Sequence, residues 1–505
     1  MSSAGARLVV GGVLFVTLSC GGDDIVNPTT GTLVITTATT GSGTDPDGYT
    51  IILDGAGRGP IPASGSATLD DVRTGTHQVQ LTGIAANCQL QGQGTLVITV
   101  AAGDTATAAF ALVCGVSTGL EHRIGIRGRG ELYDRATGAT FVPRGNNYVV
   151  LAQQVAPGGD LITYHSTFNP GLYDPARIDQ VLAAMQADGY NVVRSWINHC
   201  CSSAAVGNPA GGLSDAYIVN VVDFLRRAKA HGLYTILTVD DVPAVGGYTD
   251  ILYSGCCELF NGWNLHYLSA GGVLANQNFW HDFVQALRQH GAPTETILAY
   301  ELRNELTYES DLPPLSLDTG QVATANGRSY DLADPASRQQ MMDDNMVYWS
   351  DQMVATIRAL DPDALVAVGF FQPQAPNPTR IGDPRVTRPF PAIAQSTVDI
   401  IDLHAYPGLE LTLPQYVENY AMAGFTRQAI IMGEFGAIRR TYGSTGEAAQ
   451  ALKAWQIASC RYGFAGWLTW TWDLESPPDF WSATSMDSAI DRSLAPAQRA
   501  DPCAS

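Results

Sequence analysis

Two hydrophobic patterns divide the chain of 505 residues. Before about residue 115, apolar and polar residues alternate over short runs that are separated by Gly, Asp and Pro. The runs are 32–36, 49–53, 77–81 and 95–100. Short alternating runs between turn residues, without a long helical pattern, are typical of a small β-sandwich. We therefore predict an all-β domain over residues 31–116.

From residue 122 onward, segments with apolar residues three and four positions apart alternate with continuous apolar runs. The helical spacing occurs at 178–185, 218–225, 279–287 and 342–353. The runs that predict strands are 142–149, 191–197, 233–240, the run leading to Glu305, 364–369, 398–404, 428–434 and 464–472. Eight strands in this alternation favour a (β/α)8 TIM barrel, an α/β fold, over residues 122–505. Residues 131–148 predict a hairpin that closes the barrel floor before the first strand.

Polar and aromatic residues cluster at or near the ends of these predicted strands. They are Arg194, Asn304, Glu305, His404, Tyr406, Glu434 and Trp470. The ends of parallel barrel strands converge on one face, so Glu305 and Glu434 can meet there although they are far apart in sequence. Cleaving a glycosidic bond with retention needs two carboxyl groups roughly 5 Å apart. A single glutamate at a strand end is more often a solvated charge, so the prediction depends on the pair.

Six short motifs, in this order and spacing, resemble glycoside hydrolase family 5, the cellulase-like family of retaining (β/α)8 glycosidases. They are Arg-Gly-Asn-Asn at 144–147, Asn-Val-Val-Arg at 191–194, Tyr-Glu-Leu-Arg-Asn-Glu at 300–305, His-Ala-Tyr at 404–406, Gly-Glu-Phe-Gly at 433–436 and Gly-Trp-Leu-Thr-Trp at 466–470. The likeness covers roughly residues 124–490. Two positions depart from it: Val242 lies near a position that is often His, and Leu306 follows the Asn-Glu pair where Pro is frequent.

The resemblance implies that Glu305 is the acid/base and Glu434 the nucleophile. It also implies that Asn304 contacts the sugar 2-hydroxyl and that Trp470 forms a platform under the reacting sugar. All four residues lie within the motifs that match the family.

Electrostatics suggests roles for the remaining residues of the cluster. Arg194 and Tyr406 within hydrogen-bond reach would favour the charged form of the nucleophile, whereas Glu305 should be protonated more often. His404 would order this polar floor or contact the substrate. A buried polar network without catalytic duty is the alternative for Arg194 and His404. We expect Glu301 to be a structural ion-pair partner.

Further substrate contacts are expected on the same face of the barrel. Asn147 belongs to the first motif, and Trp196, Trp263 and Trp472 could stack on sugars, although each could equally be a core residue. The segments after the third and fourth strands, residues 241–275 and 306–335, are long. Long insertions on this face of a barrel usually shape the substrate cleft.

The N-terminus and the composition indicate export. Residues 1–20 combine Arg7 with a short apolar run and end in Cys20, which resembles a bacterial lipoprotein signal whose Cys is lipidated; plain secretion is the alternative. Residues 21–30 form a polar tether. The β-sandwich is similar to immunoglobulin-like or PEGA-type surface modules and has few aromatic residues, which favours a spacer. A net charge of −20 argues against a nucleic-acid partner.

Eight cysteines besides Cys20 suggest disulfides in an exported protein. Cys88 should pair with Cys114, the vicinal pair Cys200-Cys201 with Cys256-Cys257, and Cys460 with Cys503. The alternative is a zinc site that uses His199, but the usual C-x-x-C spacing is missing.

The sequence thus predicts a retaining β-glycosidase in the bacterial cell envelope or secreted, most simply endo-acting on a β-1,4-linked glucan or mannan. Its partners would be a β-linked polysaccharide and, through the lipid anchor, a membrane. The carboxylates carry the chemistry, so no metal or organic cofactor is expected. The alternatives are a glycan-binding barrel that has lost catalysis, and a structural surface lipoprotein.

Overall fold

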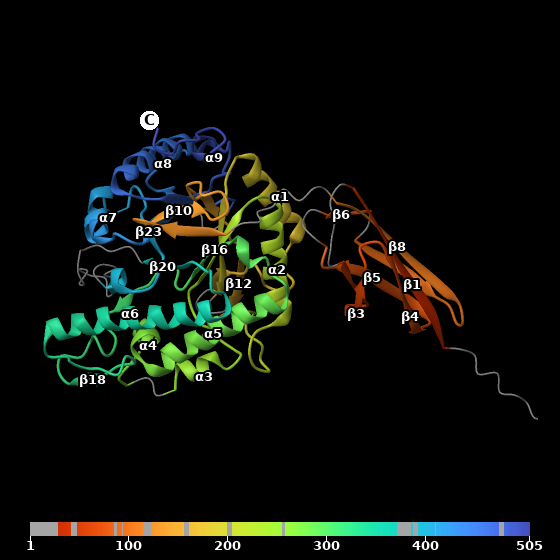
Figure 1. Cartoon of the computed structure of the whole chain (residues 1–505), viewed down its shortest axis with the longest axis horizontal. Helices are drawn as coiled ribbons and strands as arrows, with labels where there is room; N and C mark the ends of the chain where they lie inside the picture. The colour runs from red at the N-terminus through yellow and green to blue at the C-terminus, as the bar shows by residue number, and fades with distance from the viewer. Residues whose placement is uncertain are drawn as a thin grey trace, which may run out of the picture. The chain divides into compact units, whose positions relative to one another are not determined.

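The computed structural model describes residues 29–41, 48–84, 88–92, 94–114, 123–155, 161–198, 205–254, 258–370, 385–386, 392–409, 411–473 and 479–504. Contacts divide the chain into two compact units, one made by the strands up to Cys114 and one that follows it (Figure 1). None of the helices in the described ranges is both long and apolar enough to cross a membrane. The signal, the tether and Cys20 lie outside the described residues.

The first unit consists of two four-stranded sheets, which confirms the predicted all-β fold. One sheet has the order β4 (Gly65–Arg73), β1 (Thr30–Gly41), β8 (Thr105–Cys114) and β6 (Cys88–Gln91). The other has the order β3 (Ala56–Ile61), β2 (Tyr49–Leu53), β5 (Gly75–Thr82) and β7 (Thr95–Val100). Side chains along β8 alternate between exposed and buried, because every second residue of a strand faces the core. Cys88 and Cys114 are both disulfide-bonded.

The second unit contains a closed barrel of eight parallel strands, as predicted. In barrel order they are β11 (Arg144–Asn147), β14 (Val192–Asn198), β15 (Tyr234–Val239), β16 (Ile297–Glu301), β20 (Val366–Phe370), β22 (Ile400–His404), β23 (Ala429–Phe435) and β25 (Gly466–Thr469). β25 pairs with both β23 and β11, which closes the ring. Both faces of a barrel strand are covered, and every residue is buried in β11, β15, β16, β20, β22, β23 and β25.

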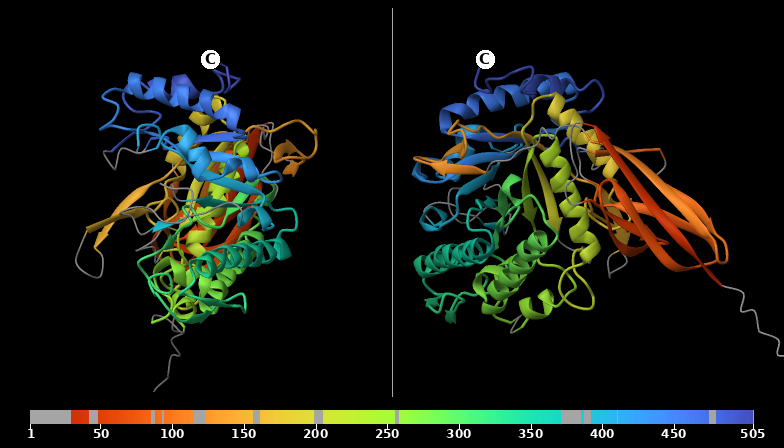
Figure 2. Two further views of the ribbon diagram at one scale, coloured as in Figure 1. Left: turned by 90° about the vertical axis from the view of Figure 1, so that its left-hand side faces the viewer. Right: turned by 45° about the vertical axis from the view of Figure 1, so that its right-hand side comes forward.

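Helices surround the barrel strands (Figures 1 and 2). They are α1 (Pro175–Ala187), α2 (Asp215–Ala230), α3 (Tyr248–Leu252), α4 (Gly262–Leu268), α5 (Ala270–Gln289), α6 (Pro335–Leu360), α7 (Leu413–Asn419), α8 (Thr445–Ser459) and α9 (Ala489–Leu494). The short 3-10 helices are η1 (Thr294–Thr296), η2 (Ile393–Gln395), η3 (Met422–Gly424) and η4 (Cys460–Tyr462). In α1, the N-cap carboxylate of Asp174 accepts two backbone N–H groups, and Ile178, Val181, Leu182 and Met185 are buried as their spacing predicts.

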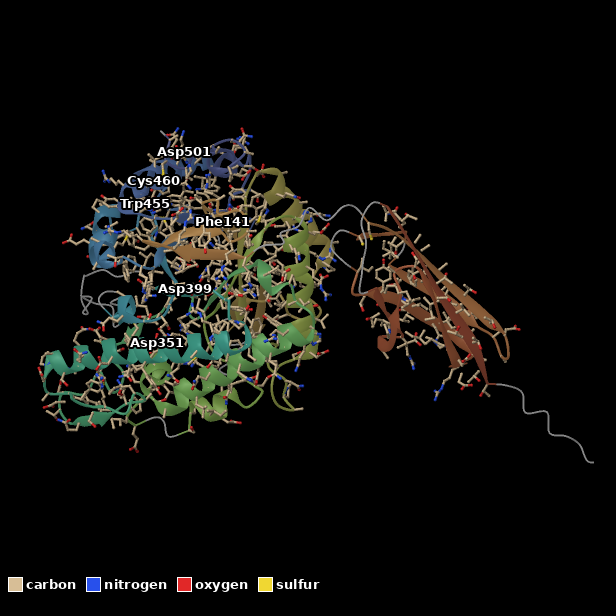
Figure 3. All side chains as sticks on the ribbon, in the orientation of Figure 1. Phe141, Asp351, Asp399, Trp455, Cys460 and Asp501 are labelled. Atoms are coloured by element: carbon tan, nitrogen blue, oxygen red, sulfur yellow. A yellow bond between two sulfur atoms is a disulfide. The ribbon has the colours of Figure 1, made fainter. Side chains whose placement is uncertain are left out.

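A hairpin closes the floor of the barrel, but it begins before the predicted segment 131–148. Its strands are β9 (Ile124–Arg127) and β10 (Glu131–Asp134), and they pair antiparallel. Ile124 and Leu132 share an apolar cluster with residues from several barrel strands. Phe141, which Figure 3 labels, packs edge-on against Tyr234 with ring centroids 5.1 Å apart. This end of the barrel is apolar, so the polar strand ends lie on the opposite face.

Additional segments follow the barrel strands. A hairpin of β12 (Leu151–Val155) and β13 (Leu161–His165), which the sequence did not predict, follows the first strand. The long segment after the third strand contains α3 and α4. The remaining short strands are β17 (Tyr308–Glu309), β18 (Gln321–Ala323), β19 (Ser329–Asp331), β21 (Arg385–Val386), β24 (Ala437–Ile438) and β26 (Phe480–Trp481). The segments after strands seven and eight are joined because β24 pairs with β26.

A disulfide fixes the C-terminal end of the second unit. Cys460, labelled in Figure 3, bonds to Cys503 with Cα atoms 5.8 Å apart. This confirms the predicted pair. The two vicinal cysteine pairs and His199 fall outside the described residues, so their predicted cross-links and the zinc alternative stay predictions.

Candidate active site

Arg194 lies at the centre of the polar end of the barrel. It extends from β14, is fully buried, and donates five hydrogen bonds to four side chains, which lie on or just after three other strands. Its acceptors are both Glu301 oxygens (2.9 and 2.7 Å), Asn147 Oδ1 (2.9 Å), Glu434 Oε1 (2.8 Å) and Asn304 Oδ1 (2.6 Å). A planar guanidinium has five N–H donors in a rigid fork, so it can hold all these groups at once.

Glu434 lies near the end of β23 and is surrounded by donors. Besides Arg194, the Tyr406 hydroxyl donates to Glu434 Oε2 at 2.5 Å, and His404 Nδ1 lies 3.3 Å from the same oxygen. The side chain is only 6% exposed. Burial raises the pKa of Glu434, while His404 and Arg194 lower it, and the raising effect is larger. The expected donors are therefore present, but desolvation outweighs them.

Tyr406 remains a proton donor at this site. Burial, and then the neighbouring charge of Glu434, raise the pKa of its phenol well above the ordinary value. The phenol therefore keeps its proton and can stabilise negative charge on Glu434.

Glu305 lies beyond the end of its barrel strand. β16 ends at Glu301, and the following residues carry Glu305 into the mouth of the barrel. Its Oε1 is 2.8 Å from His404 Nδ1, and its side chain is 33% exposed. A carboxylate oxygen of Glu305 and one of Glu434 lie within 4.8 Å of each other. The expected meeting of the two carboxylates at about 5 Å is confirmed, and the more exposed of the two is Glu305.

The two asparagines near Arg194 differ from each other in role. Asn304 is 9% exposed, and Arg194 donates to its Oδ1, which leaves its amide nitrogen as the group that can donate to another partner. Asn147 is completely buried: its oxygen accepts from Arg194 and its nitrogen donates to the Gly433 and Thr469 carbonyls. The prediction that Asn147 binds substrate is wrong, because all its polar atoms hold the barrel together.

The tryptophans separate into core and cleft residues. Trp196 is 1% exposed and packs between Arg194 and Trp470. The Arg194 guanidinium carbon lies 4.5 Å from the centre of its ring, and the Trp470 ring centroid lies 5.3 Å from its own. Trp472 is 4% exposed and packs edge-on against Tyr190. The prediction that these two stack on sugars is wrong, since their faces are covered by protein.

Trp470 and Trp263 are only half-buried and remain candidates for stacking. Trp470 follows β25 next to Gly436, where an added Cβ would lie 2.6 Å from the Trp470 carbonyl oxygen. Glycine at 436 therefore allows the close approach of Trp470. Trp263, in α4, lies over the guanidinium carbon of Arg303 at 3.7 Å. A buried cation on one ring face holds the indole in place.

Three residues of the site have roles that the sequence did not assign. Asp402, on β22 two positions before His404, is fully buried beneath the cluster, and strand alternation could have indicated it. Thr238 donates to Glu301 Oε1 at 3.1 Å. His165, from the unpredicted hairpin, packs edge-on against Trp196 at 4.7 Å and lies 6.2 Å from Trp470. No motif marks His165.

Glu301 is the ion-pair partner that the sequence predicted. It is completely buried against Arg194. Burial raises the pKa of Glu301 to about 8, against the lowering effect of Arg194. This carboxylate faces the barrel interior beneath the mouth, so it supports Arg194 and does not reach a substrate.

Two groups of side chains have the spacing of metal ligands. They are Glu305, His404 and Glu434, and, deeper in the barrel, Glu301, Asp402 and His404. In both groups the carboxylates already face Arg194 or the His404 ring. A cation already supplied by the chain competes with a metal ion for these oxygens. The arrangement that remains is two facing carboxylates of unequal exposure, which suits acid/base and nucleophilic catalysis.

Similar solved structures include several carbohydrate-active enzymes. An endo-1,4-β-mannanase from Rhizomucor miehei is 16% identical, with a TM-score of 0.52 over 75% of this chain and 99% of that one. A β-mannanase from the blue mussel Mytilus edulis is 14% identical (TM-score 0.45; 76% and 98% covered). An endocellulase from Pyrococcus horikoshii is 14% identical (TM-score 0.46; 75% and 98% covered). At 16% identity and a TM-score of 0.52, the likeness to the Rhizomucor miehei enzyme shows a shared fold and no more.

Sequence comparison is more specific. None of the curated proteins matches the chain. The family described as Cellulase (glycosyl hydrolase family 5) matches residues 155–476, well over half of the chain and most of the barrel. The match includes Arg194, Glu305, His404 and Glu434. The chain therefore belongs to glycosyl hydrolase family 5.

Proposed function

We propose that this glycoside hydrolase cleaves β-1,4-linked glucan or mannan by double displacement with retention of configuration. The observation that carries the proposal is the approach of Glu305 and Glu434 carboxylate oxygens to within 4.8 Å. Inverting enzymes need a wider separation, because a water molecule must fit between the sugar and the base. That a β-1,4-mannanase and an endocellulase are among the structures of this fold supports the substrate class.

In the first step, the Glu305 carboxylic acid donates its proton to the glycosidic oxygen while a Glu434 oxygen attacks the anomeric carbon. The bond to the leaving sugar breaks, and a glycosyl ester forms on Glu434. In the second step, the Glu305 carboxylate takes a proton from water, the water oxygen attacks the anomeric carbon, and the ester bond to Glu434 breaks. Glu305 suits the exchange with water because it is the more exposed carboxylate.

Donors around Glu434 stabilise its charge when the ester forms and breaks. Arg194 and Tyr406 each donate to a different oxygen of the carboxylate. Such donors are already in place before reaction, so they need no reorganisation in the transition state. Because the pKa of Glu434 is raised, the acid limb of kcat/KM should lie above the pH at which an ordinary glutamate ionises.

Substrate would contact the rim of the barrel. The Asn304 amide nitrogen would donate to the sugar 2-hydroxyl, because Arg194 already occupies the amide oxygen. Trp470 would stack on the sugar that reacts, and Trp263, held by Arg303, would stack on a neighbouring sugar. A cleft with sugars on both sides of the cleaved bond favours endo action on a polymer. The double displacement uses two carboxyl groups and needs no organic cofactor.

The signal-like N-terminus supports a place in the bacterial cell envelope. We propose export, with lipidation of Cys20 tethering the enzyme to a membrane through residues 21–30 and the β-sandwich acting as a spacer. Substrate would then be an extracellular or periplasmic polysaccharide.

The test is incubation with a panel of β-glucans, β-mannans and xylans, followed by product analysis by mass. Oligosaccharides released from a glucan or mannan at early times support the proposal. The matched controls are Glu305→Gln and Glu434→Gln, which keep side-chain size and remove the carboxyl groups. The proposal would be contradicted if the wild type bound these polymers without cleaving them. It would also be contradicted if either variant cleaved them as fast as the wild type.

A further inference from the structure

Asp402 is a buried carboxylate to which the proposed double displacement gives no role. It lies on β22, two residues before His404, so both side chains project from the same face of the strand. Its Oδ1 accepts the Gly433 backbone N–H at 2.6 Å, immediately before the proposed nucleophile. Its Oδ2 lies 3.4 Å from Arg194 Nε and 3.9 Å from His404 Nε2. One carboxylate thus contacts three parts of the site.

The glycine before Glu434 shows how closely Asp402 packs. A Cβ at position 433 would lie 1.9 to 2.2 Å from the Asp402 carboxyl atoms. No side chain fits there unless the carboxylate moves, so glycine is required at this position because Asp402 is present. The Gly-Glu step of β23 and the carboxylate of β22 therefore form one packed unit.

One ring nitrogen of His404 faces the two reacting glutamates, and the other faces Asp402. Its Nδ1 lies 2.8 Å from Glu305 Oε1 and 3.3 Å from Glu434 Oε2. Its Nε2 faces Asp402 Oδ2, and within the described part of the chain neither of these two atoms has a hydrogen-bond partner. Ionised carboxylates only accept hydrogen bonds, and Nδ1 faces that of Glu434 while Nε2 faces that of Asp402, so both ring nitrogens are best occupied by a proton.

We propose that Asp402 is a positioning residue that keeps both nitrogens of His404 protonated, so that the Nδ1–H is directed at the two reacting glutamates. The inference depends on the proposed function only for its effect on turnover. Through His404, the negative charge of Asp402 beneath the site sustains a cation between Glu305 and Glu434. Arg194 alone cannot do this, because it forms an ion pair with Glu434 but, in the part of the chain that the structure describes, no hydrogen bond or ion pair with Glu305.

The charges around His404 support this assignment. The groups facing the ring or coupled to it are Glu305, Glu434, Asp402, Arg194 and, through Arg194, Glu301. Burial alone would lower the pKa of His404, but Glu434, Asp402 and Glu305 raise it well above the usual range. Burial alone would raise the pKa of Asp402, but His404 and Arg194 lower it. The two side chains thus favour each other's charged forms.

The variant that tests the role is Asp402→Asn. The amide oxygen can still accept the Gly433 N–H, so the packing is kept, while the negative charge is lost and an N–H group faces two cations. In wild-type protein with labelled histidine, the His404 ring signal, identified by its loss in His404→Asn, should stay that of the imidazolium beyond the usual midpoint near pH 6.5. In Asp402→Asn the midpoint should fall by about one pH unit or more.

The matched control is Asp399→Asn. Asp399, labelled in Figure 3, is a buried carboxylate just before the same strand, and it also accepts a backbone N–H, from Val366 at 2.8 Å, and an arginine, Arg358 at 2.5 Å. Among the described residues it has no hydrogen bond or ion pair with His404, so this variant should lower stability and leave the His404 midpoint unchanged.

Kinetics give a second readout. The ratio of kcat/KM for Asp402→Asn to that of the wild type should decrease about tenfold as the pH rises through the lowered midpoint. A ratio that is constant with pH, or an equal shift in Asp399→Asn, would overturn the proposal. A His404 that titrates at or below its ordinary midpoint in the wild type would overturn it without any variant. If the wild type cleaves no β-glycan, the proposed function fails, yet the titration still decides the role of Asp402.

Discussion

Replacing Arg194 by methionine should destabilise the barrel strongly. The change removes the cation that donates five hydrogen bonds to Glu301, Asn147, Glu434 and Asn304, and all four side chains lie in the interior. Breaking a buried ion pair by removing one partner costs about 3–5 kcal/mol. Glu301 loses two hydrogen bonds here and Glu434 loses one, so we expect the upper end of that range, about 5 kcal/mol. That is a large share of the roughly 5–15 kcal/mol by which a domain is stable.

The loss should also depend on pH. Burial already raises the pKa of Glu301 to about 8 and that of Glu434 above its usual value, and loss of Arg194 would raise both further. A carboxyl group with a raised pKa in the folded state contributes stability that is present below its unfolded pKa and lost as the pH rises through the folded pKa. The deficit of Arg194→Met should therefore be largest at neutral and alkaline pH, and it should narrow toward pH 4.

The assay is urea unfolding, followed by tryptophan fluorescence at several pH values. The control is Arg492→Met, which removes an ion pair between Arg492 and Asp487. These side chains are 59% and 61% exposed, so the change should cost at most about 1 kcal/mol of stability. A urea midpoint for Arg194→Met that equals that of Arg492→Met would refute the reasoning. So would a loss of unfolding free energy, relative to the wild type, that is the same at every pH.

Three further predictions concern individual side chains. Glu434→Ala should abolish turnover, and azide should restore it as the glycosyl azide of inverted configuration; a retained azide product would exchange the roles of Glu434 and Glu305. Burial lowers the pKa of His266 to about 3, so its neutral form contributes stability that is lost as the pH falls from about 6.5. Between pH 7 and pH 4, the free energy of unfolding measured in urea should fall by about 3 kcal/mol less for His266→Gln than for the wild type. An equal fall in both proteins would contradict this. Trp263→Ala should raise KM for polysaccharide roughly tenfold and leave kcat for small aryl glycosides unchanged; unchanged KM would place Trp263 outside the cleft.

Much of the fold could be predicted from sequence because its signals are local. Continuous apolar runs such as 429–435 are strands buried on both faces, and helical spacing such as that of Ile178, Val181 and Leu182 marks the face that packs on them. The boundaries were less accurate. The fourth strand ends at Glu301, so Glu305 belongs to the loop that follows it.

The site was predictable where geometry follows from topology. Strand ends of a parallel barrel must converge, so Arg194, His404 and Glu434 could be placed together without coordinates. The burial of an aromatic side chain does not follow in this way. Trp196 is covered by His165, from a hairpin that no pattern indicated, and by Trp470. Its place near a strand end is that of a possible substrate-binding residue. Only the packing of other segments decides whether its ring is buried or exposed.

The charge of Asp402 illustrates a second limit. Strand alternation indicates that Asp402 and His404 share a face, but the role of Asp402 depends on Gly433 of the neighbouring strand. A contact between residues of two strands, set by their register, is visible only in three dimensions.

The central claim is retention through Glu305 and Glu434, and product stereochemistry tests it most directly. Proton NMR of the anomeric region, recorded within the first minutes of hydrolysis of a β-1,4-linked oligosaccharide, distinguishes the two anomers before mutarotation mixes them. The account predicts that the β-anomer appears first and the α-anomer only later. Initial release of the α-anomer would contradict it, because carboxylates this close leave no room for a directly attacking water.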